Sequence, residues 1–237
     1  MTARLFAWSV HLLTASGAVF AFLALLAIEA RDWRLALIWI AAALAIDAFD
    51  GTLARWARVK TVAPRIDGET LDLIIDYLNY VFVPAVLIWR AELVPAGLAP
   101  WLAAAILVSA LYNFTRRDLK TEDNYFRGFP ALWNVVAFYL FVTGPAPEAA
   151  AIVVAALAAL TFTSVPVVHP FRVRDYGRWL PLLSLLWALA TIALVWPGWS
   201  PGARGLCLAL SFGTLAALTG LGLLRGLRGA RGTTDRP

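Results

Sequence analysis

The sequence is poor in cysteine and in charged side chains. Its one cysteine, Cys207, excludes an intrachain disulfide, and its apolar neighbours indicate an inert packing thiol. Charged residues make up only 15% of the 237 residues, against 61% hydrophobic ones, and the mean hydropathy is +0.75. Such a chain is too apolar for a soluble globular domain. The composition therefore predicts an integral membrane protein.

Apolar runs recur along the whole chain. A spanning helix needs about 20 mostly apolar residues, and the first run is too long for a signal-peptide core, so we expect it to be retained. We expect an all-α fold, a polytopic membrane bundle of about eight transmembrane helices, in one domain over residues 1–228 with a disordered tail over 229–237. The expected limits of the eight helices are 5–28, 33–55, 69–90, 98–115, 129–145, 148–168, 179–196 and 204–225.

The formal net charge of +5 is explained by membrane topology. Lys and Arg lie at the ends of apolar runs, so they give no support for nucleic-acid binding. Sixteen of the 20 Lys and Arg residues lie near the N-terminus or at and beyond the C-terminal ends of the second, fourth, sixth and eighth runs. The other four lie around the segments that follow the first, third and seventh runs. Because cytoplasmic segments are the richer in Lys and Arg, we expect both termini in the cytoplasm.

Four aspartates lie in or beside the second and third apolar runs. Asp47 and Asp50 are three residues apart and therefore share one face of a helix. Asp72 and Asp76, four apart, do the same. An unpaired charge at the centre of a membrane helix costs roughly 2.5–3.5 kcal/mol, and two such pairs would repel unless cations lay between them. Oxygen ligands of this kind suit Mg²⁺ or Mn²⁺, and paired ions about 3.5–4 Å apart often assist displacement at phosphorus.

The residues beside these aspartates suit a ligand that carries phosphate. Gly51 and Ala54 have small side chains where a nucleotide could approach the helix backbone, and Arg55 carries a planar fork suited to phosphate. Gly68 repeats the arrangement at the start of the third run. The full pattern, Asp-x2-Asp-Gly-x2-Ala-Arg followed by Gly-x3-Asp-x3-Asp, resembles the signature of the CDP-alcohol phosphatidyltransferase family at all eight fixed positions.

Within that family the chain looks most like the bacterial phosphatidylcholine synthases. The features that carry this resemblance are the long spacer 56–67 and the segments 112–113, 128–134 and 169–174. They extend the resemblance from about Asp47 to Arg174, whereas the first, seventh and eighth runs match only in being apolar.

The resemblance implies an enzyme of the bacterial inner membrane, commonly a homodimer, with its active site facing the cytoplasm. It would transfer the phosphatidyl group of CDP-diacylglycerol to choline and release CMP. By resemblance, Asp47, Asp50 and Asp72 bind Mn²⁺ or Mg²⁺, as a pair of ions. Asp76 is implied to be a further ligand or the base that takes the proton of the alcohol. The residues implied to bind the CMP portion are Gly51, Ala54, Arg55 and Gly68.

A choline site needs aromatic faces and diffuse negative charge, because a quaternary ammonium has no N–H to donate. Tyr80 lies one helical turn beyond Asp76 and is expected on the same face, although helix packing would account for this residue equally well. The aromatic residues near the motif that could contact choline are Tyr77, Tyr80, Tyr112, Tyr125, Trp133 and Tyr139.

A polar cluster follows the sixth apolar run. His169, Arg172 and Arg174 could hold a phosphate or a lipid headgroup, although a lone histidine at a helix end is more often a simple hydrogen-bonding residue. The other histidine, His11, lies within the first run, and we assign it no role.

Two other kinds of function stay open at the level of sequence. A member of the same family could use serine, inositol or glycerol phosphate as the acceptor, or CDP-choline with diacylglycerol; acceptors bearing phosphate or carboxylate would need an extra basic cluster. A divalent-cation transporter would also carry carboxylates in its helices. That function leaves Gly51, Ala54 and Arg55 unexplained and predicts carboxylates near the middle of the membrane.

Overall fold

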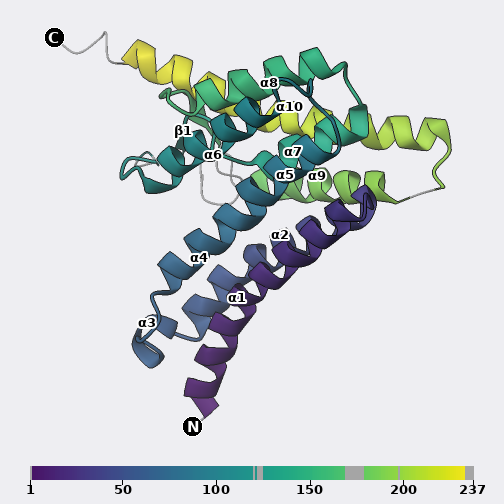
Figure 1. The fold of residues 1–237 in the computed structure, drawn as a ribbon. Coiled ribbons are helices and arrows are strands. Elements are labelled where there is room, and N and C mark those ends of the chain that lie inside the picture. Colours follow the sequence, from purple (N-terminus) through teal and green to yellow (C-terminus); the bar gives the residue numbers. More distant parts are fainter. Residues whose placement is uncertain (1, 120, 122–124, 169–178, 197, 233–237) are drawn as a thin grey trace. The chain divides into compact units, whose positions relative to one another are not determined.

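The computed structural model describes residues 2–119, 121, 125–168, 179–196 and 198–232 (Figure 1). This part of the chain is helical apart from one two-stranded pairing, which confirms the all-α class. The elements are α1 (Thr2–Glu29), α2 (Trp33–Trp56), α3 (Val59–Val62), α4 (Gly68–Tyr77), η1 (Leu78–Phe82), α5 (Val83–Arg90), α6 (Ala99–Thr115), β1 (Phe126–Arg127), α7 (Trp133–Thr143), α8 (Pro147–Leu160), β2 (Pro166–Val167), α9 (Trp179–Val195) and α10 (Pro201–Gly232).

Two compact units make up this structure. The first lies within Met1–Phe114 and Ala131–Ala155, and the second within Thr115–Pro130 and Ala156–Pro237. The aspartates of the motif all belong to the first unit.

Every predicted apolar run forms a helix, but the helices differ in length. Among the described residues, four are long and apolar enough to cross a membrane: Ala3–Glu29, Trp33–Trp56, Gly68–Arg90 and Pro201–Leu224. The other four, α6, α7, α8 and α9, are apolar but have 17 residues or fewer. The chain is therefore a multi-pass membrane protein.

Some predicted helix limits were wrong for identifiable reasons. The fifth helix begins at Trp133 rather than 129, because Gly128 and Ala131 have φ angles of 76° and 56°, which an α-helix does not allow. The sixth ends at Leu160 rather than 168, since the chain turns into β2 at Pro166. Helix α10 begins at Pro201 and continues to Gly232, into the segment expected to be a tail.

The first unit is built on α1 and α2, which lie side by side in Figure 1 and are joined by a tight turn. Asp32 begins α2 by accepting a hydrogen bond from the Leu35 N–H at 3.0 Å. Asp67 begins α4 in the same way, with bonds from the N–H groups of Glu69 at 3.1 Å and Thr70 at 3.3 Å. A hydrogen bond from the Thr70 hydroxyl holds the pKa of Asp67 below its usual value. The cap that precedes Asp72 and Asp76 is therefore charged at neutral pH.

The third membrane helix contains a widened turn immediately after Asp76. Residues Leu78–Phe82 form a π-helix, in which the Val83 N–H donates to the Leu78 carbonyl. Pro84 follows and has no N–H for the carbonyl four residues earlier, so the wider turn suits this position. Single π-turns inside α-helices are frequent at functional sites.

The second unit contains the strand pair that the sequence did not predict. Strands β1 and β2 run antiparallel, with Phe126 opposite Val167 and Arg127 opposite Pro166. Gly128 follows β1 and donates its N–H to the Val165 carbonyl at 2.8 Å. A Cβ there would lie 2.6 Å from the Leu160 carbonyl oxygen, so only glycine fits this close approach.

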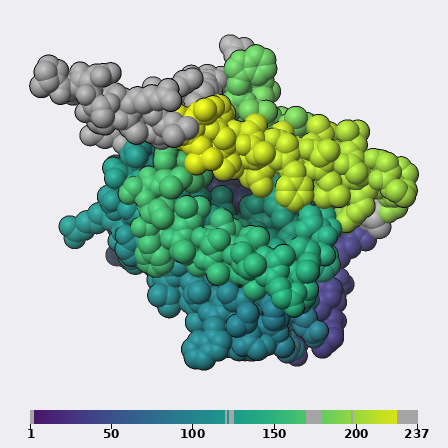
Figure 2. Space-filling view, turned by 90° about the horizontal axis from the view of Figure 1, so that it is seen from above, coloured from purple at the N-terminus to yellow at the C-terminus, as the bar shows by residue number. Residues whose placement is uncertain are grey.

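Helix α10 presents an apolar surface. Figure 2 shows this helix, yellow-green to yellow, along the face in view. Exposed hydrocarbon along a long helix is expected where lipid rather than water surrounds it. The large exposed apolar side chains on α10 are Leu206, Leu210, Phe212, Leu223 and Leu224.

Candidate metal centre

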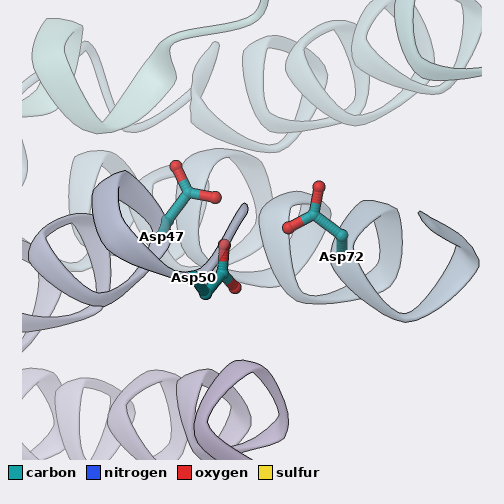
Figure 3. A group of neighbouring side chains, drawn as sticks. All are labelled: Asp47, Asp50 and Asp72. Carbon is teal, nitrogen blue, oxygen red and sulfur yellow. The ribbon is translucent and has the colours of Figure 1, made fainter. Parts of the chain in front are cut away.

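Three of the four aspartates converge on one point. Asp47 and Asp50 come from α2 and Asp72 comes from α4, and one carboxylate oxygen of each lies within 4.8 Å of the others. Figure 3 shows the three carboxylates turned toward a shared space. The spacing in the sequence explains this, because one turn of α2 places Asp47 and Asp50 on the same face.

Neutral hydroxyl groups bind two of these carboxylates. Thr14 of α1 donates its hydroxyl to Oδ2 of Asp50 at 2.7 Å, and both side chains are buried, with exposed fractions of 8% and 5%. Tyr80 of η1 donates its hydroxyl to Oδ2 of Asp47. Neither donor carries a charge, so these bonds stabilise the individual carboxylates without neutralising them.

Asp76 lies beside this group without joining the convergence. It follows Asp72 by one turn of α4, is half-buried, and lies near the carboxylates of Asp47, Asp72 and Asp50. Its carboxylate is thus near the site, but among the described residues the three oxygens that meet belong to Asp47, Asp50 and Asp72.

The donor set fits a divalent cation that prefers oxygen. Mg²⁺ binds oxygen at about 2.0–2.1 Å in an octahedron, so ligand oxygens on opposite sides of one ion are about 4 Å apart. Neighbouring ligand oxygens of the same octahedron are about 3 Å apart, so the three oxygens, which lie within 4.8 Å of one another, would have to move closer together around an ion. With that movement, Asp47, Asp50 and Asp72 could hold a metal ion.

The glycines expected to bind the nucleotide differ in what surrounds them. A Cβ on Gly51 would meet only the Nη1 of Arg55, at 3.7 Å, among described atoms outside its own helix backbone. A Cβ on Gly68 would lie 3.2 Å from Cε1 of His11. Packing therefore favours glycine at Gly68, whereas the protein itself leaves room for a methyl group at Gly51.

The other two nucleotide-binding candidates lie at the same end of α2. Arg55 is exposed and donates a hydrogen bond from Nη2 to the Thr52 hydroxyl at 3.0 Å, so its guanidinium group lies at the surface. Ala54 is half-buried and packs against the apolar cluster of Ala7, Val10 and Ala57.

Of the expected choline residues, Tyr80 is placed at the acidic site. The side chain of Tyr77 contacts α6 instead. Its hydroxyl donates to the Leu107 carbonyl at 3.2 Å, and its ring lies edge-on to that of Phe114, with 5.9 Å between the ring centroids. Tyr112 is 41% exposed, whereas Trp133 and Tyr139 are buried in the first unit. Tyr125 belongs to the second unit and is fully buried against Val168 and Leu180.

The three residues predicted to hold a phosphate or a lipid headgroup, His169, Arg172 and Arg174, lie outside the described residues.

The loop between α2 and α4 carries an exposed ion pair. Lys60 Nζ lies 2.6 Å from Oε1 of Glu69, and the hydrogen bond from Lys60 to Glu69 raises the pKa of that ammonium. Both side chains are well exposed, so the pair is screened by water and contributes little to stability.

Sequence reasoning missed the contribution of α1. Thr14 donates a hydrogen bond to Asp50, and His11 lies against Gly68. Both Thr14 and His11 belong to the first apolar run, whose composition gives no sign of a functional role. The signal that could have found them was their polarity inside a membrane helix, where polar groups usually have a partner.

Comparison with known proteins agrees with the geometry. The model of the CDP-alcohol phosphatidyltransferase family matches residues 9–169, so the resemblance reaches into α1, further than the sequence motifs had indicated. A phosphatidylcholine synthase of Pseudomonas aeruginosa is 41% identical over 222 residues, covering 94% of this chain and 92% of that protein. A protein of the same name from Bradyrhizobium diazoefficiens is 44% identical, with 80% and 71% covered, and one from Legionella pneumophila is 36% identical, with 87% of each covered.

Proposed function

This chain belongs to the CDP-alcohol phosphatidyltransferase family, and we propose that it is a phosphatidylcholine synthase that transfers the phosphatidyl group of CDP-diacylglycerol to choline. The observation that carries the proposal is the convergence of Asp47, Asp50 and Asp72 where the family's motif lies. The relatives named phosphatidylcholine synthase align over most of this chain and support choline as the acceptor.

The reaction exchanges one bond to phosphorus for another. The choline oxygen forms a bond to the phosphorus that carries diacylglycerol, the bond from that phosphorus to the bridging oxygen breaks, and CMP leaves with the electron pair. We assign the proton of the choline hydroxyl to the carboxylate of Asp76, which is near the other three but outside their convergence. Divalent cations, Mn²⁺ or Mg²⁺, would neutralise the diphosphate and the charge that develops on the leaving oxygen.

The residues at the end of α2 suit the CMP portion. Gly51 is exposed and has no close side chain other than Arg55, so a nucleotide can approach the backbone there. The exposed guanidinium of Arg55 can pair with phosphate oxygens in two places at once.

The decisive experiment identifies the lipid that is made. Purified full-length protein is incubated with CDP-diacylglycerol, Mn²⁺ and labelled choline, serine, inositol or glycerol 3-phosphate in parallel. We expect phosphatidylcholine and CMP from choline alone. Lipid products from serine or glycerol 3-phosphate, without any from choline, would overturn choline as the acceptor. The assignment of the chain to its family would not be affected.

Tyr80 offers a test of how choline is held. Its hydroxyl bonds Asp47, which places its ring beside the acidic site. Replacing the ring in Tyr80→Leu should raise the KM for choline by about 2–30-fold, as expected from a cation–π contact worth about 0.5–2 kcal/mol. The KM for CDP-diacylglycerol should change less. Tyr77→Leu, at a ring that contacts Phe114, serves as the control, and equal rises in both KM values for Tyr80→Leu would indicate packing instead.

We further propose eight transmembrane passes with both termini and the acidic site on the cytoplasmic side, in a homodimer. The sixteen-to-four distribution of Lys and Arg supports the orientation. In a Cys207→Ser background, a membrane-impermeant maleimide should label Arg204→Cys in intact cells, and Lys60→Cys only after permeabilisation. Labelling of Lys60→Cys in intact cells with Arg204→Cys protected would reverse the orientation.

A further inference from the structure

Helix α1 contacts the helices that carry the acidic site at three positions spaced by three residues, which places them on one side of α1. His11 lies against Gly68 at the start of α4. Thr14 donates its hydroxyl to Asp50 of α2. Gly17 accepts a hydrogen bond at its carbonyl from Nδ2 of Asn79, at 3.0 Å. The same side of α1 thus meets α4, α2 and η1 in turn.

Close packing at Gly17 fixes the position of α1. A Cβ on Gly17 would lie 2.4 Å from Cγ2 of Ile75, so only glycine allows α1 to come this near to α4. Asn79 is buried and bonds the Ile75 carbonyl as well, also at 3.0 Å, which ties the two helices together at this level. Because Thr14 is one turn from Gly17, its side chain has little freedom to leave Asp50.

The bond between Thr14 and Asp50 controls the orientation of a carboxylate. The Thr14 hydroxyl has one proton, and two acceptors are within reach, Oδ2 of Asp50 at 2.7 Å and the Val10 carbonyl at 3.3 Å. The shorter contact to a carboxylate is the stronger one. With Oδ2 held in this way and both side chains buried, the rotation of the Asp50 carboxylate relative to Asp47 and Asp72 is fixed.

We propose that Thr14 is a positioning residue, whose hydroxyl orients the Asp50 carboxylate for a divalent cation and makes α1 part of the active site. The inference depends on the proposed function, in which Asp47, Asp50 and Asp72 bind that cation. Groups that orient a metal ligand typically change metal affinity or activity by about 10–100-fold when they are removed.

The test measures metal binding without substrate. Thr14→Val keeps the shape of the side chain and removes the hydroxyl, so the Kd for Mn²⁺ of the purified full-length protein, measured by titration calorimetry, should rise about tenfold or more. Thr14→Ser restores the hydroxyl and should bind within about threefold of the wild type. In turnover assays the Mn²⁺ concentration for half-maximal rate should rise in parallel, with the KM for choline unchanged.

Two variants control for the loss of a hydroxyl elsewhere. Ser16→Ala removes a group on the same helix that bonds the Leu13 carbonyl, and Thr161→Val repeats the substitution at a buried threonine that bonds the Leu157 carbonyl. Both should bind Mn²⁺ like the wild type. If Thr14→Val does not fold, Thr14→Ala, which adds no bulk, is expected to show the same rise in Kd.

The outcomes separate this inference from the metal site itself. Wild-type affinity in Thr14→Val, together with lost binding in Asp50→Asn, would overturn the role of Thr14 and leave the metal site standing. A Thr14→Ser variant as weak as Thr14→Val would also overturn it, since the hydroxyl would then be irrelevant. Wild-type binding in Asp50→Asn would refute the metal site.

Discussion

Asp50→Asn and Asp72→Asn are each expected to lower kcat by about a thousandfold or more while the protein stays folded. The amide keeps the shape of the side chain, and its oxygen at position 50 can still accept the bond from Thr14. The change removes a negative ligand from a set of three that converge within 4.8 Å. A thousandfold loss corresponds to about 4 kcal/mol of transition-state stabilisation, within what metal ions supply in phosphoryl chemistry.

Matched controls lie next to the motif. Asp67→Asn keeps a good capping side chain at the start of α4, and Glu69→Gln changes an exposed side chain that pairs with Lys60. Both remove a carboxylate within five residues of Asp72, and both should retain activity within a few-fold of the wild type. Near-normal turnover of Asp50→Asn across a range of Mn²⁺ concentrations, with an unchanged Tm, would falsify the metal-dependent mechanism.

The convergence of Asp47, Asp50 and Asp72 could be predicted because it depends on two local regularities. Residues three and four apart share a helix face, and carboxylates inside apolar helices need a common partner. Helix existence was predictable for a similar reason, since each run is long and uniformly apolar. Neither argument requires knowledge of how distant helices pack.

The role of α1 could not be read from the sequence, since it depends on packing. Thr14 and Asp50 are 36 residues apart, and an isolated threonine in a membrane helix can satisfy its hydroxyl on the preceding turn, as Thr14 could with Val10. The bond to Asp50 depends on how α1 packs against α2 and α4, and the close approach of α1 to Ile75 at Gly17 is part of that packing. Glycine is common in membrane helices, so its presence in an apolar run does not reveal which helix packs against it.

The aromatic residues show a second limit of sequence reasoning. An α-helical repeat predicts Tyr80 on the face of Asp76; Tyr80 does lie near Asp76, but in a π-turn and with its hydroxyl bonded to Asp47, which the repeat alone does not predict. Tyr125 lies in the core of the second unit, packed against Val168 and Leu180, which the sequence did not indicate. The strands β1 and β2 have two residues each, too few for an alternating pattern to be visible.

Asp76→Asn is expected to lower kcat by about 10²–10⁴-fold, the usual contribution of a general base, while the Kd for Mn²⁺ stays within about twofold of the wild type. The reason is geometric, because the three oxygens that converge come from Asp47, Asp50 and Asp72, with Asp76 beside them. Asp72→Asn, one turn away, is the matched comparison and should lose Mn²⁺ affinity as well as turnover.

The two roles considered for Asp76 make opposite predictions for these measurements. A tenfold or larger rise in the Kd for Mn²⁺ in Asp76→Asn would identify it as a metal ligand and remove it as the base. The choice of acceptor gives an independent check, because an alcohol with a lower pKa needs less help to lose its proton. The difference in kcat between the wild type and Asp76→Asn should therefore narrow for a more acidic analogue of choline, whereas for Asp72→Asn it should not change.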